Sequence, residues 1–137
     1  MNEFAEYRPS AGHSLNLVGV AAASCCETAV SYFGFVNRLY TFFARSTHRW
    51  AVLVTSHPPR TSIVKRLADT RRSAHSDAIK SLYQGYEYIQ NALDILTSDS
   101  SQTSATRNYA QNLVTKMDKL ETLLLTQFWN DTLSRFN

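Results

Sequence analysis

Residues 73–97, SAHSDAIKSLYQGYEYIQNALDILT, decide the fold. Apolar side chains recur along this stretch in steps of three and four residues, at Ile79, Leu82, Tyr86, Ile89, Leu93 and Leu96. Such steps place the side chains in one stripe along a helix, as in a coiled-coil seam. Ser73 can cap the N-terminus, and Asp77 in the first turns suits the positive end of the helix dipole. The pattern therefore predicts one long amphipathic helix.

A second long helix is expected over about residues 105–135. Its predicted seam is Ala110, Leu113, Met117, Leu120, Leu124 and Phe128, with Trp129 and Leu133 beside it. The segment between the two helices, residues 98–104 (SDSSQTS), is short and polar. Two long helices joined by a short loop pack antiparallel. We therefore expect a mainly α fold with a long antiparallel helix hairpin at residues 73–137.

Shorter helices are expected upstream of this hairpin. Residues 14–24 predict a short apolar helix, and residues 27–45 predict a longer one with aromatic side chains at helical spacing. Ser46 can cap a further helix over residues 47–54. The following Pro58-Pro59 ends that helix, because proline donates no backbone hydrogen bond and restricts its predecessor. Glycine and proline are otherwise scarce, which disfavours a turn-rich β fold.

The positive charge of the chain is concentrated in one short segment. The net charge is +3 over 137 residues, a length typical of one domain. Residues 60–72 hold one acid, Asp69, and five basic side chains: Arg60, Lys65, Arg66, Arg71 and Arg72. This basic connector, between helices at 1–59 and the hairpin at 73–137, could bind phosphate oxygens of nucleic acid. A solvated surface loop explains the same charges, so both interpretations stay open.

No catalytic or metal-binding constellation is evident in the sequence. The histidines and the two cysteines show no C-x-x-C or H-x-x-x-H spacing, which favours solvated or capping histidines and buried cysteines (His13, Cys25, Cys26, His48, His57, His75). The acids of the hairpin are expected on its outer, solvated faces: Asp77, Glu87, Asp94, Asp118, Glu121 and Asp131. We therefore expect a non-enzyme without cofactor or metal, and no small-molecule ligand is evident.

Four segments together resemble a known family. They are residues 9–19 (PSAGHSLNLVG), 46–53 (STHRWAVL), 67–82 (LADTRRSAHSDAIKSL) and 113–137 (LVTKMDKLETLLLTQFWNDTLSRFN). In order and spacing they are similar to the hobo-Activator-type (hAT) transposases, most of all to domesticated and zinc finger MYM-type protein 1-like members. The resemblance spans about residues 7 to 137. It implies the edge of a ribonuclease-H-like core, at 1–59, followed by part of its helical insertion.

The resemblance also implies what this chain would lack. Members of that family cut DNA with two metal ions held by three carboxylates. Two of these precede the segment around His13 and the third follows the insertion, so none maps onto a residue here. The family's C-x-x-H motif retains His13 but has Ser10 in place of cysteine. Its Arg-Trp pair retains Arg71 but has Arg72 in place of tryptophan, and arginine is a poorer platform for stacking a base.

Three functions follow as expectations. The first is a transposase-derived fragment without catalytic activity. The second is a nucleic-acid-binding helical module that uses the basic connector, with DNA as the partner. The third is a helical protein-interaction module whose seams bind a second copy or another helical protein. We further expect no membrane span, an intracellular and soluble protein, and, from the resemblance alone, a nuclear location.

Overall fold

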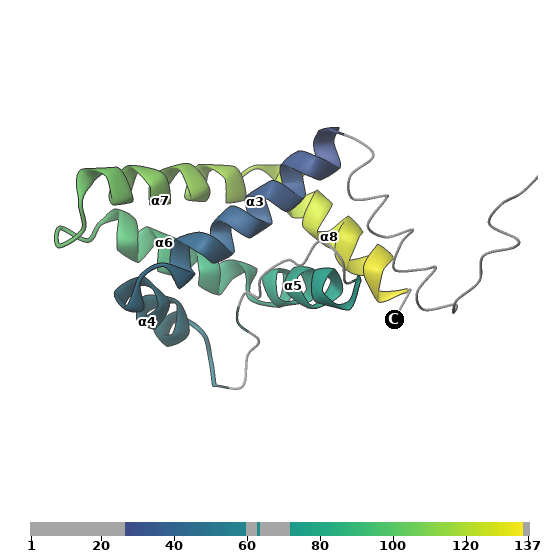
Figure 1. Cartoon of the computed structure of the whole chain (residues 1–137), viewed down its shortest axis with the longest axis horizontal. Coiled ribbons are helices and arrows are strands. Elements are labelled where there is room, and N and C mark those ends of the chain that lie inside the picture. The colour runs from purple at the N-terminus through teal and green to yellow at the C-terminus, as the bar shows by residue number, and fades with distance from the viewer. Residues whose placement is uncertain (1–26, 60–62, 64–71, 136–137) are drawn as a thin grey trace, which may run out of the picture.

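The computed structural model of the chain describes residues 27–59, 63 and 72–135. They form six helices and no strand, so the predicted mainly α fold is confirmed (Figure 1). In chain order the helices are α3 (Glu27–Ala44), α4 (Thr47–Ser56), α5 (Arg72–Gln84), α6 (Tyr86–Thr97), α7 (Ser104–Met117) and α8 (Leu120–Ser134). The helix predicted at 14–24 lies outside the described residues.

The predictions for α3 and α4 agree with the structure. Helix α3 was expected over residues 27–45 and spans Glu27–Ala44. The predicted cap of α4 is present, because the Ser46 hydroxyl accepts a hydrogen bond from the Arg49 backbone N–H at 3.3 Å. Helix α4 ends at Ser56, shortly before the two prolines.

Each of the two expected long helices is divided, which corrects the prediction of continuous helices. The first is interrupted at Gly85, between α5 and α6, and it begins at Arg72 rather than after a cap at Ser73. The second is interrupted at Asp118 and Lys119, between α7 and α8. Lys119 has an extended backbone (φ −73°, ψ 132°), so the helix stops and restarts in a new register.

Despite these interruptions the predicted antiparallel hairpin is present, as two pairs of packed helices. Helix α6 packs along α7, and α5 packs along α8 (Figure 1). The two interruptions are joined where they meet, because the Tyr86 hydroxyl at the start of α6 donates to the Met117 carbonyl at the end of α7 (2.8 Å). Both arms of the hairpin therefore change direction at the same level.

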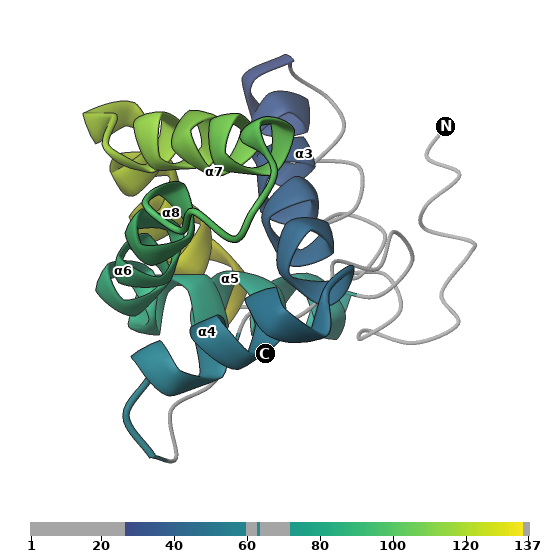
Figure 2. The same ribbon diagram turned by 90° about the vertical axis from the view of Figure 1, so that its left-hand side faces the viewer.

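Helix α3 closes the core from the side opposite α6 and α8 (Figure 2). Its aromatic side chains bridge to the other helices. Phe33 contacts Trp129 of α8 with ring centroids 5.0 Å apart, and Phe42 stacks on Tyr109 of α7 at 5.5 Å. Large buried aromatic rings dominate core energetics, so α3 is the element that holds both parts of the hairpin together.

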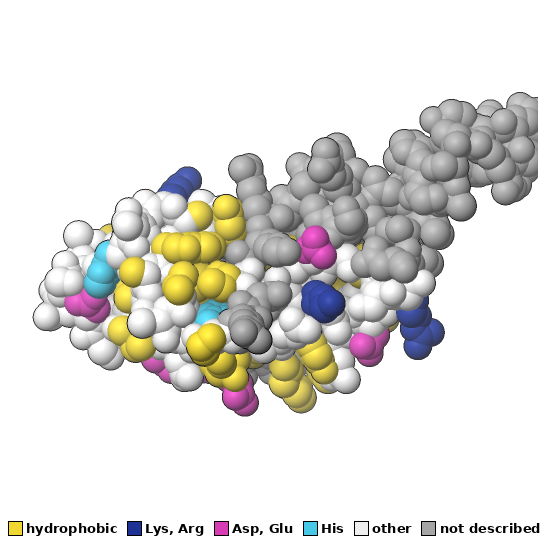
Figure 3. All heavy atoms as spheres, turned by 90° about the horizontal axis from the view of Figure 1, so that it is seen from below, with side chains coloured by type: hydrophobic (Ala, Val, Ile, Leu, Met, Phe, Trp, Pro, Cys, Tyr) yellow, Lys and Arg dark blue, Asp and Glu magenta, His cyan; other side chains and the backbone are white. Residues whose placement is uncertain are grey.

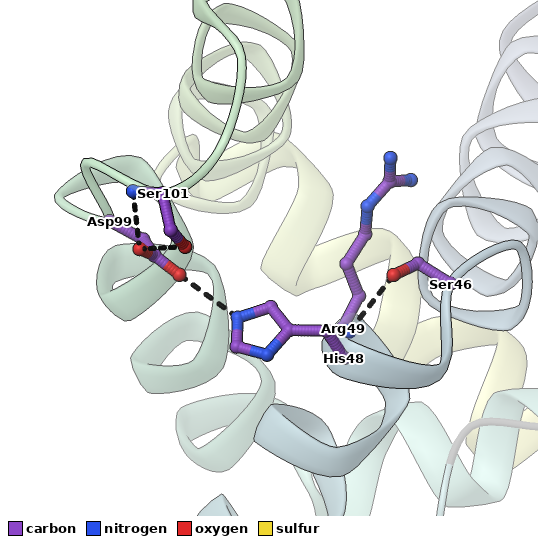
Figure 4. A network of polar contacts seen from close by, with 5 residues as sticks. All are labelled: Ser46, His48, Arg49, Asp99 and Ser101. Carbon is purple, nitrogen blue, oxygen red and sulfur yellow. Dashed lines mark hydrogen bonds and ion pairs between the residues drawn. The ribbon is translucent and has the colours of Figure 1, made fainter.

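Polar contacts hold α4 against the loop between α6 and α7 (Figure 4). His48 Nε2 lies 2.9 Å from Asp99 Oδ2, and Asp99 Oδ1 accepts bonds from the Ser101 hydroxyl and backbone N–H. These bonds, that of the Ser101 hydroxyl first, lower the pKa of Asp99 to about 2. Arg49 donates to the Phe42 carbonyl at 2.9 Å and lies over the Phe42 ring.

Candidate protein-interaction surface

Most residues of the predicted basic connector lie outside the described part of the chain. Arg60, Lys65, Arg66 and Arg71 are outside it, as is His13, and Arg72 is placed only as the first residue of α5. Nucleic-acid binding through this segment therefore stays a prediction. On the face drawn in Figure 3, the described lysine and arginine side chains stand apart from one another, while hydrophobic side chains form larger groups.

The described histidines occupy separate places in the fold. His48 pairs with Asp99, His57 Nδ1 lies 2.7 Å from the Leu53 carbonyl oxygen, and His75 stacks on Phe33 with centroids 5.6 Å apart. Among the described residues, no group of three or more histidine, cysteine or acidic side chains could hold a metal ion. His13, Cys25 and Cys26 lie outside these residues.

The acids of the hairpin lie where the sequence predicted them. All six are exposed to solvent: Asp77, Glu87, Asp94, Asp118, Glu121 and Asp131. General acid–base pairs need a shared, partly buried environment that separates their pKa values. These six carboxylates do not have such an environment, so they are explained as a solvated surface.

The unexpected surface lies on α8. Four large apolar side chains point to solvent: Leu120 is 67% exposed, Leu124 54%, Phe128 56% and Leu123 42%. We call these four residues the α8 patch. Leu120, Leu124 and Phe128 follow one another at intervals of four, so they form a row along one side of the helix, about 12 Å long.

This finding corrects the predicted seam of the second long helix. Ala110, Leu113 and Met117 are buried as expected, but Leu120, Leu124 and Phe128 are not. The buried positions of α8 are instead Thr122, Thr126, Trp129 and Leu133. The two residues between α7 and α8 leave the helical path, and this rotates α8 relative to an uninterrupted helix. Trp129 and Leu133, predicted beside the seam, become part of it.

Buried hydroxyl groups fix this rotation. Tyr32 of α3 donates a hydrogen bond to Thr126 Oγ1 at 2.9 Å, and Thr126 donates onward to the Thr122 carbonyl at 2.8 Å. Burial raises the pKa of the Tyr32 hydroxyl far above its usual value. A buried hydroxyl without a partner is costly, so Tyr32 requires a polar group on the inward side of α8. Thr126 provides it, and the leucines remain outside.

A groove adjoins the α8 patch at the two interruptions. It is an open cavity of about 700 Å³ between the α5–α6 and α7–α8 connections, and Leu120 and Leu123 line it together with Tyr83, Met117 and Lys119. We call it the bend groove. Tyr86 is also in its wall, and burial, together with the nearby Asp118 charge, raises the pKa of Tyr86 to about 12. The patch and the groove share two leucines and form one continuous surface.

Phe128 is held in a defined position at the other end of the patch. Its ring contacts the Trp129 ring edge-to-face, with centroids 5.3 Å apart, and Trp129 is itself buried against Phe33. An exposed aromatic ring that is already oriented loses little freedom when a partner covers it. Phe128 is therefore suited to be an anchor for binding.

The sequence contains a weak signal for the orientation of α8. It is a second series of residues, Thr122, Thr126, Trp129 and Leu133, whose steps of four, three and four are those of a helix seam. It competes with the more hydrophobic series of leucines. Hydrophobicity alone favours the wrong series, because the need of Tyr32 for a buried hydroxyl partner is not visible in the sequence.

Comparison of the chain with protein families, with curated proteins and with solved structures finds no match. Within the described ranges, no helix is both long and apolar enough to cross a membrane.

Proposed function

We propose that this chain is a non-catalytic helical module that binds a protein partner through the α8 patch and the bend groove. The observation that carries the proposal is the orientation of α8. This helix turns two threonines inward together with Trp129 and Leu133, and it turns three leucines and a phenylalanine outward. A helix in a soluble protein normally buries its more apolar side, and a partner that covers the patch accounts for the reversal.

The size of the patch supports binding. The four side chains present on the order of 400 Å² of apolar surface, within the range of patches that mark interaction sites. If a partner contributes an equal area, burial of both is worth on the order of 20 kcal/mol. Lost translational and rotational freedom costs about 4–15 kcal/mol. Ordering of side chains and imperfect pairing of polar groups cost further free energy, so this area permits association without fixing its strength.

The shape of the surface indicates an amphipathic helix as the partner. A row of apolar side chains at intervals of four is complementary to a similar row on another helix. The bend groove, at the Leu120 end of the row, has room for a large apolar side chain of that helix. Helix-in-groove binding of this kind needs no rearrangement of the core.

A photo-crosslinker placed in the full chain tests this proposal. A benzophenone amino acid at Leu124 is expected to give a discrete covalent adduct in cells, with the crosslinked peptide assigned by mass spectrometry either to this chain or to one other protein. The matched control is Ile95 of α6, which is 52% exposed and equally apolar but lies outside the α8 patch. If position 124 gives only the diffuse background of position 95, the α8 patch does not bind a protein.

The transposase origin and the binding of DNA stay predictions from the sequence. Most of the basic connector and the motif residues His13 and Arg71 lie outside the described part of the chain. The exposed, separated carboxylates of the described helices support the proposed lack of catalytic activity.

A further inference from the structure

We infer that the partner of the α8 patch is the α8 patch of a second copy, packed antiparallel about a two-fold axis at Leu124. This inference rests on the proposed function and names its partner. A surface that pairs with itself must place complementary features at equal distances on both sides of the axis. The α8 patch meets this condition in its shape, and the flanking charges meet it as well.

The shapes are complementary across the axis. Leu120 and Phe128 lie four residues before and after Leu124, about 6 Å along the helix in either direction. Antiparallel pairing therefore brings each Phe128 over the partner's Leu120. The bend groove lies on the far side of Leu120, which it shares with Leu123, so the phenyl ring covers Leu120 and the groove stays beside the interface. Each copy thus supplies one Phe128 and one Leu120 to the contact, and the pairing is closed at two copies.

The charges that flank the patch are also complementary. Asp131, exposed one turn beyond Phe128, comes to the level of the partner's α7–α8 connection. That connection and the helix turns beside it carry Lys116 and Lys119 against Asp118 and Glu121, and Asp118 is already bonded to Gln90 Nε2 at 3.1 Å. An attraction between Asp131 and the partner's Lys119 follows at both ends. Parallel pairing would instead place each Asp131 beside the partner's Asp131.

The area is appropriate for a small, reversible dimer. Stable interfaces bury about 800 Å² on each partner. The four apolar side chains supply on the order of half of this, so the interface is a small one. An interface at the lower end of the size range predicts dissociation in the micromolar range, on the order of 1–100 µM.

Sedimentation velocity of the full chain over about 1–500 µM tests the inference, since this range spans the expected dissociation constant. The natural chain is expected to shift from monomer to dimer. Leu124→Asp is expected to raise the dissociation constant at least about 100-fold, because it sets two carboxylates face to face on the axis. Ile95→Asp, an equally exposed apolar position on α6, is expected to leave it unchanged. Circular dichroism and thermal unfolding of both variants establish that they are folded.

Disulfide trapping tests the antiparallel register. In a Cys25→Ser, Cys26→Ser background, chains with Leu120→Cys are mixed with chains with Phe128→Cys and oxidised. Antiparallel pairing predicts the mixed disulfide well beyond the roughly twofold excess that random pairing of equal amounts gives over either symmetric one, since a disulfide needs Cα atoms within about 7 Å. A symmetric Leu120→Cys dimer in excess would indicate parallel pairing and overturn the inference.

Other outcomes separate this inference from the proposed function. A natural chain that stays monomeric to 500 µM, or a dimer unaffected by Leu124→Asp, overturns the self-pairing. If a different protein is then crosslinked at position 124, the proposed function stands while the second copy is excluded as the partner. If neither a dimer nor a crosslinked protein is found, both fail.

Discussion

Gly85 lies where α5 ends and α6 begins, and His57 fills the space beside it. A Cβ atom at residue 85 would come within 2.8 Å of His57 Nε2 and 3.1 Å of the Ser81 carbonyl oxygen. The His57 ring cannot move away easily, because its Nδ1 is bonded to Leu53 and its other side faces Tyr88. At the scale of single residues, the interruption of the first long helix is therefore linked to the packing of α4.

Two glycine substitutions with opposite expected effects on the free energy of unfolding test this packing. Gly85→Ala is expected to lower the free energy of unfolding by about 1–3 kcal/mol, as overpacking does. Gly34→Ala in the middle of α3 is expected to raise it by about 0.5–1 kcal/mol, because its nearest neighbour is the end of the Arg38 side chain at 3.4 Å and alanine is the better helix former. Urea unfolding measures the free energy of unfolding of both variants. Equal stabilisation by both would show that His57 does not occupy this space.

Asp99 gives a pH-dependent contribution to stability. Its pKa in the folded chain, about 2, lies below the value of about 4 expected in the unfolded chain. The contribution is therefore complete above about pH 4 and is lost as the pH falls from about 4 through about 2. We expect Asp99→Asn to be less stable than the natural chain at pH 5, with a difference that narrows by pH 2. A difference that stays constant with pH would contradict the assignment.

Helix α8 is the element in which hydrophobicity and burial disagree. Its inward side holds Thr122 and Thr126, where the Thr126 hydroxyl accepts from Tyr32 and donates to the Thr122 carbonyl, while its outward side holds the α8 patch. A predicted continuous helix would have placed Leu124 inside. Because the two orientations differ in which side chains are buried, substitutions on the two sides distinguish them.

Thr126→Val and Leu124→Ser are the substitutions that distinguish the two orientations. Thr126→Val keeps the shape but removes the partner of the buried Tyr32 hydroxyl, so we expect a loss of about 1–3 kcal/mol in the free energy of unfolding. Leu124→Ser is expected to change it by less than about 0.5 kcal/mol at concentrations where the chain is monomeric. A larger loss of stability for Leu124→Ser than for Thr126→Val would place Leu124 in the core.

The sequence predicts the elements better than their relative rotation. The ends of α3, the cap of α4 at Ser46 and the loop before Ser104 follow from local signals, since capping and periodicity act within a few residues. Gly85 is a local signal too, but a single glycine is tolerated inside many helices. The restart after Lys119 has only the weak signal of the Thr122, Thr126, Trp129 and Leu133 series, because the more hydrophobic series of leucines competes with it.

At the scale of the whole molecule, α8 carries four of the nine large apolar side chains that the described residues expose, more than any other described helix. Helix α3 covers the two parts of the hairpin through its aromatic rings, and the Tyr86–Met117 bond fixes the level at which both arms turn. That turn creates the bend groove beside the α8 patch. The proposed binding surface is thus a consequence of how the hairpin bends, and binding by an added helix would complete the burial that the single chain leaves unfinished.

Leu124 lies on the outward side of α8 and Thr126 on its inward side, and native-state thiol labelling distinguishes the two positions. Leu124→Cys and Thr126→Cys are each made in a Cys25→Ser, Cys26→Ser background and labelled below about 1 µM, where an interface of micromolar affinity is open. We expect rapid labelling at position 124 and labelling at least about 100-fold slower at position 126, which requires opening of the fold. Equal rates, or faster labelling at position 126, would contradict this orientation of α8.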